Sequence, residues 1–153
     1  MTKLKKGDKA PTFAVKDSKG RKISLSSLKG KKVVLYFYPK DSTPSCTVEA
    51  CGFRDNIAEY RKKGVVVLGV SGGSEKSHNA FIAKQKLDFP LLMDKDFRIA
   101  KAYGVYGKKK FLGKEYMGIS RMTFLIDEKG KIAKIYNKVD VKTHSDEILK
   151  QLG

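Results

Sequence analysis

The chain has 153 residues, 41% of them hydrophobic, which is enough for a single domain with its own core spanning residues 1–153. No apolar run reaches the roughly 18 residues of a membrane-spanning helix, and the N-terminus lacks the apolar segment of a secretory signal. Two cysteines are too few for a disulfide scaffold and fit a reducing compartment. The cytoplasm is therefore the expected location, while an organelle or the nucleus stays open.

The charge balance is strongly basic, with 33 Lys or Arg against 16 Asp or Glu and a net charge of +17. Residues 1–40 alone hold 12 Lys or Arg and two Asp. Such a surface could attract nucleic acid, an anionic membrane or an acidic protein. Because no nucleic-acid motif or aromatic stacking platform accompanies the charge, we favour a Lys-rich, solvated exterior.

The first elements in chain order are a hairpin and a buried strand. Residues 13–15 and 23–25 flank the turn-rich segment 17–20 and predict the hairpin. Residues 33–38, Val-Val-Leu-Tyr-Phe-Tyr, are apolar, β-branched or aromatic throughout, as in a strand covered on both faces.

A helix is predicted next, ending at about Lys63 with Gly64 behind it as the C′ residue. Residues 65–70 then form a second continuous apolar run and a second buried strand. A strand, a helix and a strand with both strands buried indicate a right-handed βαβ crossover in a sheet that is covered on both faces.

The second half of the chain continues the alternation of helices and strands. The predicted elements are a helix over residues 75–86 capped by Ser74, a strand over 89–93, a helix from Asp94 to Tyr103-Gly104, a loop containing the lysines 108–110, a hairpin over 122–126 and 132–136, and a final helix capped by Thr143 or His144. This order predicts an α/β sandwich with a central mixed sheet.

Cys46 occupies the position in the chain that is best suited to a nucleophile. Pro39 ends the strand before it, Ser42 or Thr43 supplies an N-cap, and Pro44 falls near the first helical position. The sulfur therefore lies in the first helical turn, where unpaired N–H groups and the helix dipole favour an anion. The thiolate is the reactive form of cysteine, so this position favours reactivity.

Cys51 follows five residues later on the same predicted helix. Helix geometry separates the two Cα atoms by roughly 8.6 Å, whereas a disulfide needs less than about 7 Å. The two sulfurs can therefore join only if the start of the helix unwinds, which suits a transient catalytic disulfide better than a structural one.

The motif Pro39-x-x-x-Thr43-x-x-Cys46, followed by Cys51, resembles the signature of the peroxiredoxins, and more narrowly that of the Q-type or bacterioferritin comigratory branch. The resemblance covers nearly the whole chain and includes residues 7–13, 33–41, 89–92 and 114–127, together with Ser77-His78. It implies a thioredoxin-like fold and a thiol peroxidase that reduces hydrogen peroxide and organic hydroperoxides.

The resemblance also assigns roles to single residues. Cys46 would be the peroxidatic thiol and Cys51 the resolving thiol, Thr43 would hydrogen-bond the peroxide and Pro39 would shield the thiolate. Arg121, in the segment Gly-Ile-Ser-Arg before a buried strand, would hold the thiolate and polarise the peroxide. Thioredoxin or a similar dithiol would recycle the enzyme, which is expected to be a monomer without a cofactor or metal.

Some alternatives remain open at this level. A thioredoxin-like disulfide reductase needs Cys-x-x-Cys, which the five-residue spacing does not provide, and a nucleic-acid-associated protein rests on charge alone. Glu49 and Arg54 extend the arginine network or belong to a solvated helix face. His78 and His144 are interpreted as structural. The family commonly has glycine where this chain has Ser45, and serine fits if that position is helical.

Overall fold

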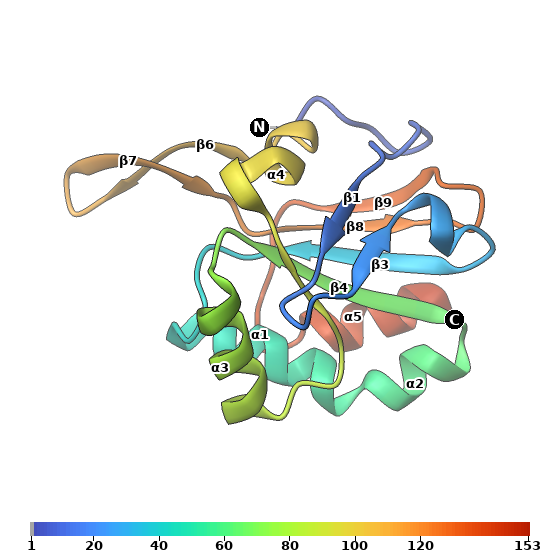
Figure 1. Cartoon of the computed structure of the whole chain (residues 1–153). Helices are drawn as coiled ribbons and strands as arrows, with labels where there is room; N and C mark the ends of the chain where they lie inside the picture. Colours follow the sequence, from blue (N-terminus) through green and yellow to red (C-terminus); the bar gives the residue numbers. More distant parts are fainter. Residues whose placement is uncertain (1) are drawn as a thin grey trace.

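Five of the apolar segments form the central sheet of the protein, whose computed structural model describes residues 2–153 (Figure 1). The strand order is β5-β4-β3-β8-β9. These strands are β3 (Lys32–Phe37), β4 (Val65–Ser71), β5 (Leu91–Met93), β8 (Met122–Ile126) and β9 (Ile132–Tyr136). β3, β4 and β5 run parallel, whereas β8 and β9 join as an antiparallel hairpin, so the sheet is mixed as predicted.

Helices cover one face of this sheet, and shorter elements cover the other (Figure 1). The helical face carries α1 (Pro44–Asp55), α2 (Ile57–Lys62), α3 (Glu75–Gln85) and α5 (His144–Leu152). The opposite face carries β1 (Ala14–Lys16), β2 (Lys22–Ser24), the 3-10 turns η1 (Ser26–Leu28) and η2 (Lys95–Phe97), and α4 (Arg98–Ala102). Within the described residues, none of the helices is both long enough and apolar enough for a membrane span.

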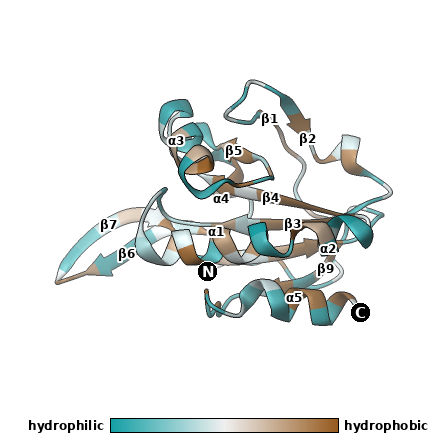
Figure 2. Ribbon diagram, turned by 90° about the horizontal axis from the view of Figure 1, so that it is seen from below, coloured by the Kyte–Doolittle hydropathy of each residue, from teal (hydrophilic) through white to brown (hydrophobic). Residues whose placement is uncertain are grey.

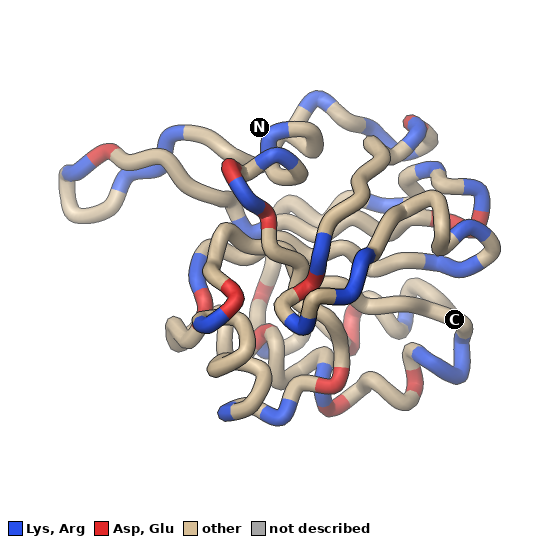
Figure 3. Tube along the Cα trace, in the orientation of Figure 1, with Lys and Arg blue, Asp and Glu red and all other residues tan. Residues whose placement is uncertain are grey.

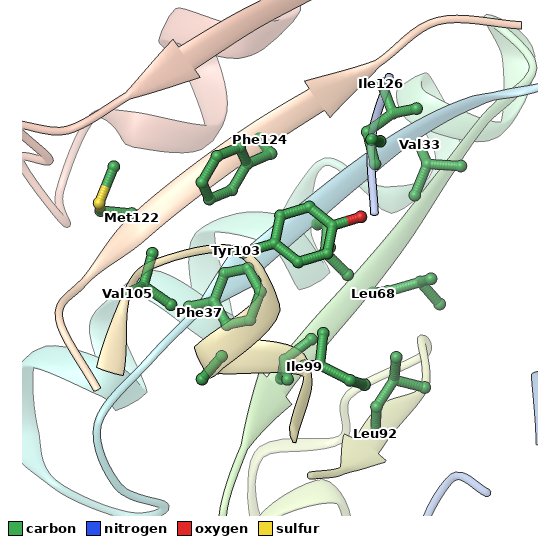
Figure 4. Packing of buried hydrophobic residues seen from close by; sticks show 14 of the residues in the cluster. Val33, Phe37, Leu68, Leu92, Ile99, Tyr103, Val105, Met122, Phe124 and Ile126 are labelled. Carbon is green, nitrogen blue, oxygen red and sulfur yellow. The ribbon is translucent and has the colours of Figure 1, made fainter. Parts of the chain in front are cut away.

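The alternation of side chains along β3 divides the core into two layers. Val33, Leu35 and Phe37 point to the face of β1, β2 and α4, where Tyr103 and Phe124 pack in an edge-on pair with ring centroids 5.0 Å apart (Figure 4). The residues between them on β3 point to the helical face. Burial on both faces explains why most residues of β3 and β4 are apolar or aromatic, and Figure 2 shows much of β4 in the brown of hydrophobic residues.

Both predicted hairpins, the βαβ unit and the cap of α3 are confirmed. The hydroxyl oxygen of Ser74 accepts a hydrogen bond from the backbone N–H of Ser77, which satisfies one of the free donors at the start of α3. Gly64 has φ +70°, as the predicted C′ position requires. The predicted strand over 89–93 is shorter than expected, because the carbonyl of Pro90 still accepts from Gly69 but its nitrogen has no N–H to donate.

The prediction of one helix from Cys46 to Lys63 is wrong in one respect, because the helix breaks at Asn56. The backbone of this residue leaves the helical region, with φ −102° and ψ 7°. Its side-chain amide donates to Ser145 and Asp146 at the start of α5, both at 2.9 Å. A tertiary contact with α5 therefore accompanies the boundary between α1 and α2, which the sequence pattern does not reveal.

The helix predicted to start at Asp94 is also interrupted. Asp96 and Phe97 adopt left-handed backbone conformations, with φ +58° and +56°, and α4 starts only after them. The buried carboxylate of Asp94 reaches across this turn and accepts hydrogen bonds from the N–H groups of Ile99 and Ala100 at 2.8 and 2.9 Å. The side chain of Asp94 therefore does cap α4. Asp94 lies further from the first helical residue along the chain than an N-cap residue, which directly precedes it.

The lysines 108–110 lie in a strand, so the prediction of a loop there is wrong. β6 (Tyr106–Phe111) and β7 (Lys114–Ile119) pair as an antiparallel hairpin that belongs to neither of the other sheets. Leu112 and Gly113 form its two-residue turn with φ +52° and +80°, which is the left-handed geometry that such hairpins favour. Lysine-rich strands lack the apolar alternation on which the prediction depended.

Candidate active site

Cys46 lies in the first turn of α1, where the chain arrives from the carboxyl end of β3. Thr43 is the N-cap residue, with the extended backbone that this position requires (φ −78°, ψ 156°), and Pro44 is the first helical residue. The residue Cys46 is only 1% exposed. The predicted position is confirmed, and Cys46 belongs to the first turn of α1, whose backbone N–H groups lack partners within the helix.

Arg121 joins the sulfur to a buried carboxylate. Its Nη2 donates to Sγ of Cys46 at 3.3 Å, and its Nη1 donates to Oε1 of Glu49 at 2.6 Å. Glu49 follows Cys46 by three residues and so shares its face of α1, whereas Arg121 comes from the short segment between β7 and β8. The structure thus places Arg121 beside Cys46. It also shows that Glu49 extends the arginine network and does not lie on a solvated helix face, the other interpretation left open by the sequence.

The charges of this group depend on one another. Burial raises the pKa of Glu49 to about 7, although Arg121 acts in the opposite direction. Burial also lowers the pKa of Arg121, but Glu49 and the Cys46 sulfur raise it by more, so this pKa lies above its ordinary value. Arg121 therefore carries a fixed positive charge between the sulfur and the carboxyl.

The other residues of the motif shape the loop before α1. The hydroxyl of Thr43 donates to the carbonyl of Lys40 at 3.0 Å, so this hydroxyl is turned toward the loop. Ser42 has φ +63°, a left-handed conformation that is uncommon outside glycine. Pro39 follows directly on Tyr38, whose N–H still donates to Val70 at 3.1 Å, so the proline ends the pairing of β3 with β4 as predicted.

Cys51 lies further along α1 in different surroundings. It is a half-buried free thiol whose Sγ lies 3.5 Å from Oε1 of Gln85, at the end of α3. Arg54 also turns toward α3 and donates to the carbonyl of Gln85 at 2.9 Å. Arg54 therefore does not extend the network of Arg121, and Cys46 and Cys51 lie on one intact helix.

A buried polar cluster next to the site was not predicted. The carboxylate of Asp41 accepts hydrogen bonds from the hydroxyls of Tyr38 at 2.6 Å and Ser77 at 2.7 Å, and it lies 2.6 Å from Nδ1 of His78. Burial raises the pKa of Asp41, but these hydrogen bonds lower it by more, so the carboxylate stays charged. A Cβ on Gly73 would lie 2.5 Å from this carboxylate, which explains why glycine occupies the turn.

This cluster fastens the loop before Cys46 to α3, so His78 has a structural role, as predicted. His144 has one as well, because its Nε2 lies 2.8 Å from the hydroxyl of Thr123, and burial and nearby Arg121 lower its pKa to about 4. No sequence signal would have paired Asp41 with His78, because 37 residues separate them.

The fold and the site together define a thioredoxin-like, thiol-dependent oxidoreductase, and comparisons with known proteins make the class more specific. Residues 6–135 match the AhpC/TSA family. The chain is 52% identical over 146 residues to a putative peroxiredoxin Bcp of Coxiella burnetii, covering 95% of this chain and 97% of that one. It is 44% identical over 152 residues to peroxiredoxin Bcp of Escherichia coli K12, covering 99% and 97%.

Solved structures agree with these sequence relatives. A PrxQ mutant of Xylella fastidiosa matches with a TM-score of 0.93 at 34% identity, covering 99% of this chain and 97% of that one. Peroxiredoxin Q of Xanthomonas campestris matches with a TM-score of 0.86 at 41% identity, covering 92% and 89%. The chain belongs to the AhpC/TSA family, and within it to the Bcp or Q-type peroxiredoxins, which confirms the resemblance. It is therefore a thiol peroxidase.

Proposed function

We propose that Cys46 is the peroxidatic thiol and that its thiolate attacks the terminal oxygen of a hydroperoxide. A sulfur–oxygen bond forms, the peroxide O–O bond breaks, and the leaving oxygen takes a proton and departs as alcohol or water. Cys46 is left as a sulfenic acid. The observation that carries this assignment is the hydrogen bond of 3.3 Å from Arg121 to Sγ, supported on the other side of the guanidinium by Glu49.

Arg121 and Thr43 would act on the reacting atoms. The guanidinium has several donors in a fixed plane, so it can hold the sulfur while another N–H polarises the peroxide. Thr43 lies three residues before Cys46, and rotation of its side chain away from Lys40 would free its hydroxyl to donate to the peroxide. Pro39 would keep water from the thiolate at the end of β3.

We propose that Cys51 resolves the sulfenic acid. Its sulfur attacks Sγ of Cys46, the disulfide forms, and the sulfenic oxygen leaves as water with the proton of the second thiol. Both residues belong to α1, where five helical steps separate their Cα atoms by roughly 8.6 Å. A disulfide needs less than about 7 Å, so the first turns of α1 must unwind during this step.

A dithiol protein of the thioredoxin type would then return two electrons and two protons to the disulfide. This requirement and the two free cysteines support a reducing compartment, for which we propose the cytoplasm, and an internal disulfide lets a monomer complete the cycle. The Xanthomonas campestris bacterioferritin comigratory protein has alkyl peroxide reduction activity. We extend this substrate class, together with hydrogen peroxide, to the present chain.

The test follows NADPH consumption with thioredoxin and thioredoxin reductase, using hydrogen peroxide and an organic hydroperoxide in parallel. Cys46→Ser should abolish turnover, because a hydroxyl does not ionise near neutral pH. Ser45→Ala, a change at the neighbouring exposed position, is the matched control and should keep most activity. Substantial thioredoxin-coupled turnover by Cys46→Ser would refute the assignment.

A further inference from the structure

The tip of the β6–β7 hairpin exposes apolar side chains that the peroxidase site does not use. Phe111 is 66% exposed and Leu112 is 87% exposed. Tyr116 and Met117 on β7 are also exposed, so four of the five large hydrophobic residues exposed in residues 2–153 belong to this one hairpin. Figure 1 shows the hairpin projecting from the body of the protein. An exposed apolar cluster of this kind marks an interaction site.

Lysines surround this apolar tip. Lys108, Lys110 and Lys114 are all exposed, and Glu115 is the only acidic residue between Tyr106 and Ile119. Figure 3 shows the basic residues on both strands of the projecting hairpin. The tip therefore combines apolar side chains at its end with positive charge directly behind them.

The hairpin is anchored at its root and projects at its tip. At the root, Tyr106 stacks on Phe97 with ring centroids 4.4 Å apart, and Ile119 is buried in the core. Nζ of Lys109 donates to the carbonyl of Ile119 at 2.8 Å. At the tip, the two-residue turn at Leu112 places its side chain at the convex end of a two-stranded ribbon.

We infer that this tip docks the protein on an anionic phospholipid bilayer. Phe111 and Leu112 enter the boundary between headgroups and acyl chains, and the lysines contact lipid phosphates. A stable protein interface buries about 800 Å² on each partner, which a convex tip of this width does not offer. A bilayer needs no such complementary surface, and its negative charge matches the lysines. This inference does not depend on the proposed function.

Docking would bring the active site close to the membrane. β7 leads from the tip to Ile119 and on to Arg121, and its six extended residues span about 20 Å. The sulfur of Cys46 accepts a hydrogen bond from Arg121, so the active site lies at the root of the hairpin.

The first experiment measures sedimentation of the full protein with vesicles of phosphatidylcholine alone or with phosphatidylglycerol, at physiological salt. Only the anionic vesicles should bind the wild-type protein. Phe111→Ser with Leu112→Ser keeps every charge, and it should weaken binding on the order of 100-fold. Hydrogen peroxide turnover by this variant should equal that of the wild type, which shows that the variant is folded. Undiminished vesicle binding by it would overturn the inference.

Charge is tested with two variants that have the same net charge. Lys110→Gln with Lys114→Gln should weaken vesicle binding by about 30-fold. Lys129→Gln with Lys131→Gln removes two exposed lysines at the β8–β9 turn, at the opposite end of the molecule from the hairpin (Figure 3), and should have little effect. Equal losses in both variants would mean that the overall charge of +17 binds the vesicles, and would refute a docking tip.

The chain contains no tryptophan, so a single one reports its own surroundings. Leu112→Trp should shift its fluorescence to the blue on anionic vesicles and be quenched by lipids brominated in their acyl chains. Glu128→Trp, at the exposed β8–β9 turn, should remain in water. A tip tryptophan that shifts instead on self-association or on adding DNA, without vesicles, would also overturn the inference.

Discussion

The two cysteines share one helix but have opposite surroundings. Cys46 is 1% exposed, lies at the helix start and accepts a hydrogen bond from the charged guanidinium of Arg121. Cys51 is half-buried, lies past the middle of α1 and faces the neutral amide of Gln85 at 3.5 Å. The first environment can stabilise an anion, and the second offers a thiol only a weak acceptor.

This difference separates the two steps of the proposed reaction. Arg121, which holds the thiolate in the proposed attack, already contacts the Cys46 sulfur in the folded protein, so the proposed attack needs no rearrangement of the backbone. Disulfide formation does need one, because an intact helix holds Cys46 and Cys51 apart. Changes near Cys46 should therefore affect attack, whereas changes near Cys51 should affect resolution alone.

The largest expected effect comes from Cys51→Ser. After one equivalent of peroxide, the wild-type protein should lose two hydrogens as the internal disulfide forms, whereas this variant should gain one oxygen at Cys46. Its thioredoxin-coupled turnover should fall to background, while its first reaction with peroxide keeps the wild-type rate. Mass spectrometry and stopped-flow measurements separate the two outcomes. A wild-type protein that stably gains one oxygen, or forms only intermolecular dimers, would remove Cys51 from the mechanism.

Unwinding of the start of α1 can be measured directly by hydrogen exchange, which gives a second test of how the two cysteines differ. Amide hydrogens from about residue 43 to residue 53 should exchange faster in the oxidised wild-type protein than in the reduced one. The strands β3 and β4 should change little, since the core on both faces of the sheet stays packed. Cys51→Ser treated with peroxide is the control, because it oxidises without forming the disulfide. Equal exchange in oxidised and reduced protein would contradict the unwinding.

Arg121→Ala should have the next largest effect, this time on attack. Loss of the cation beside the sulfur should slow sulfenic acid formation by about 10²–10³-fold in stopped-flow experiments. Arg54→Ala is the matched control. Arg54 is an arginine on α1, the helix of Cys46, but it donates to the carbonyl of Gln85 instead of to the sulfur. An unchanged attack rate in Arg121→Ala would exclude this residue from the site.

Sequence reasoning predicted those parts of the fold and the site that depend on local pattern. The buried runs of β3 and β4, the helix start at Cys46 and the family motif all lie in contiguous residues. Contacts across the fold were harder to predict. Arg121 was found only through the resemblance, and the Asp41–His78 contact, between residues 37 apart, was not found. Such pairs leave no periodic signal in a single sequence.

The missed β6–β7 hairpin and the break at Asn56 have a similar cause. β6 carries three consecutive lysines, and its pairing with β7 satisfies the backbone without burying a regular apolar face. The break at Asn56 coincides with hydrogen bonds to α5, about 90 residues further along the chain. Intrinsic secondary-structure propensity predicts neither the hairpin nor the helix break, because contacts with other segments of the chain determine both.

The surroundings of Cys46 can also be tested through the titration of Glu49, which makes the stability of the protein depend on pH. Its pKa is about 7 in the folded protein against an ordinary value of 4.5, so the native state binds this proton more tightly than the unfolded state. The stability that this provides is complete below pH 4.5 and is lost as pH rises through about 7, in total about 3 kcal/mol. Relative to Glu49→Gln, the wild-type free energy of unfolding should therefore fall with rising pH.

Urea unfolding of both proteins at about pH 5 and about pH 8 measures this change. The comparison with Glu49→Gln cancels groups common to both proteins, including His144, whose pKa is lowered to about 4. A difference between the two proteins that stays constant with pH, or rises with it, would contradict a buried carboxyl with a raised pKa.

The smallest expected effect concerns the surroundings of Cys51. The thiol is a weak donor, so its contact with Gln85 at 3.5 Å holds the helix only slightly. Gln85→Ala removes this acceptor and should speed disulfide formation by about 2–5-fold, since a typical hydrogen bond contributes about 0.5–1 kcal/mol. Peroxide attack should not change, because Gln85 forms no hydrogen bond with Arg121 or Glu49 among the described residues. Gln151→Ala, at the chain's other glutamine, is the control and should alter neither step. Stopped-flow kinetics resolves the two phases, and a slower attack in Gln85→Ala would mean that the two cysteines are coupled before peroxide arrives.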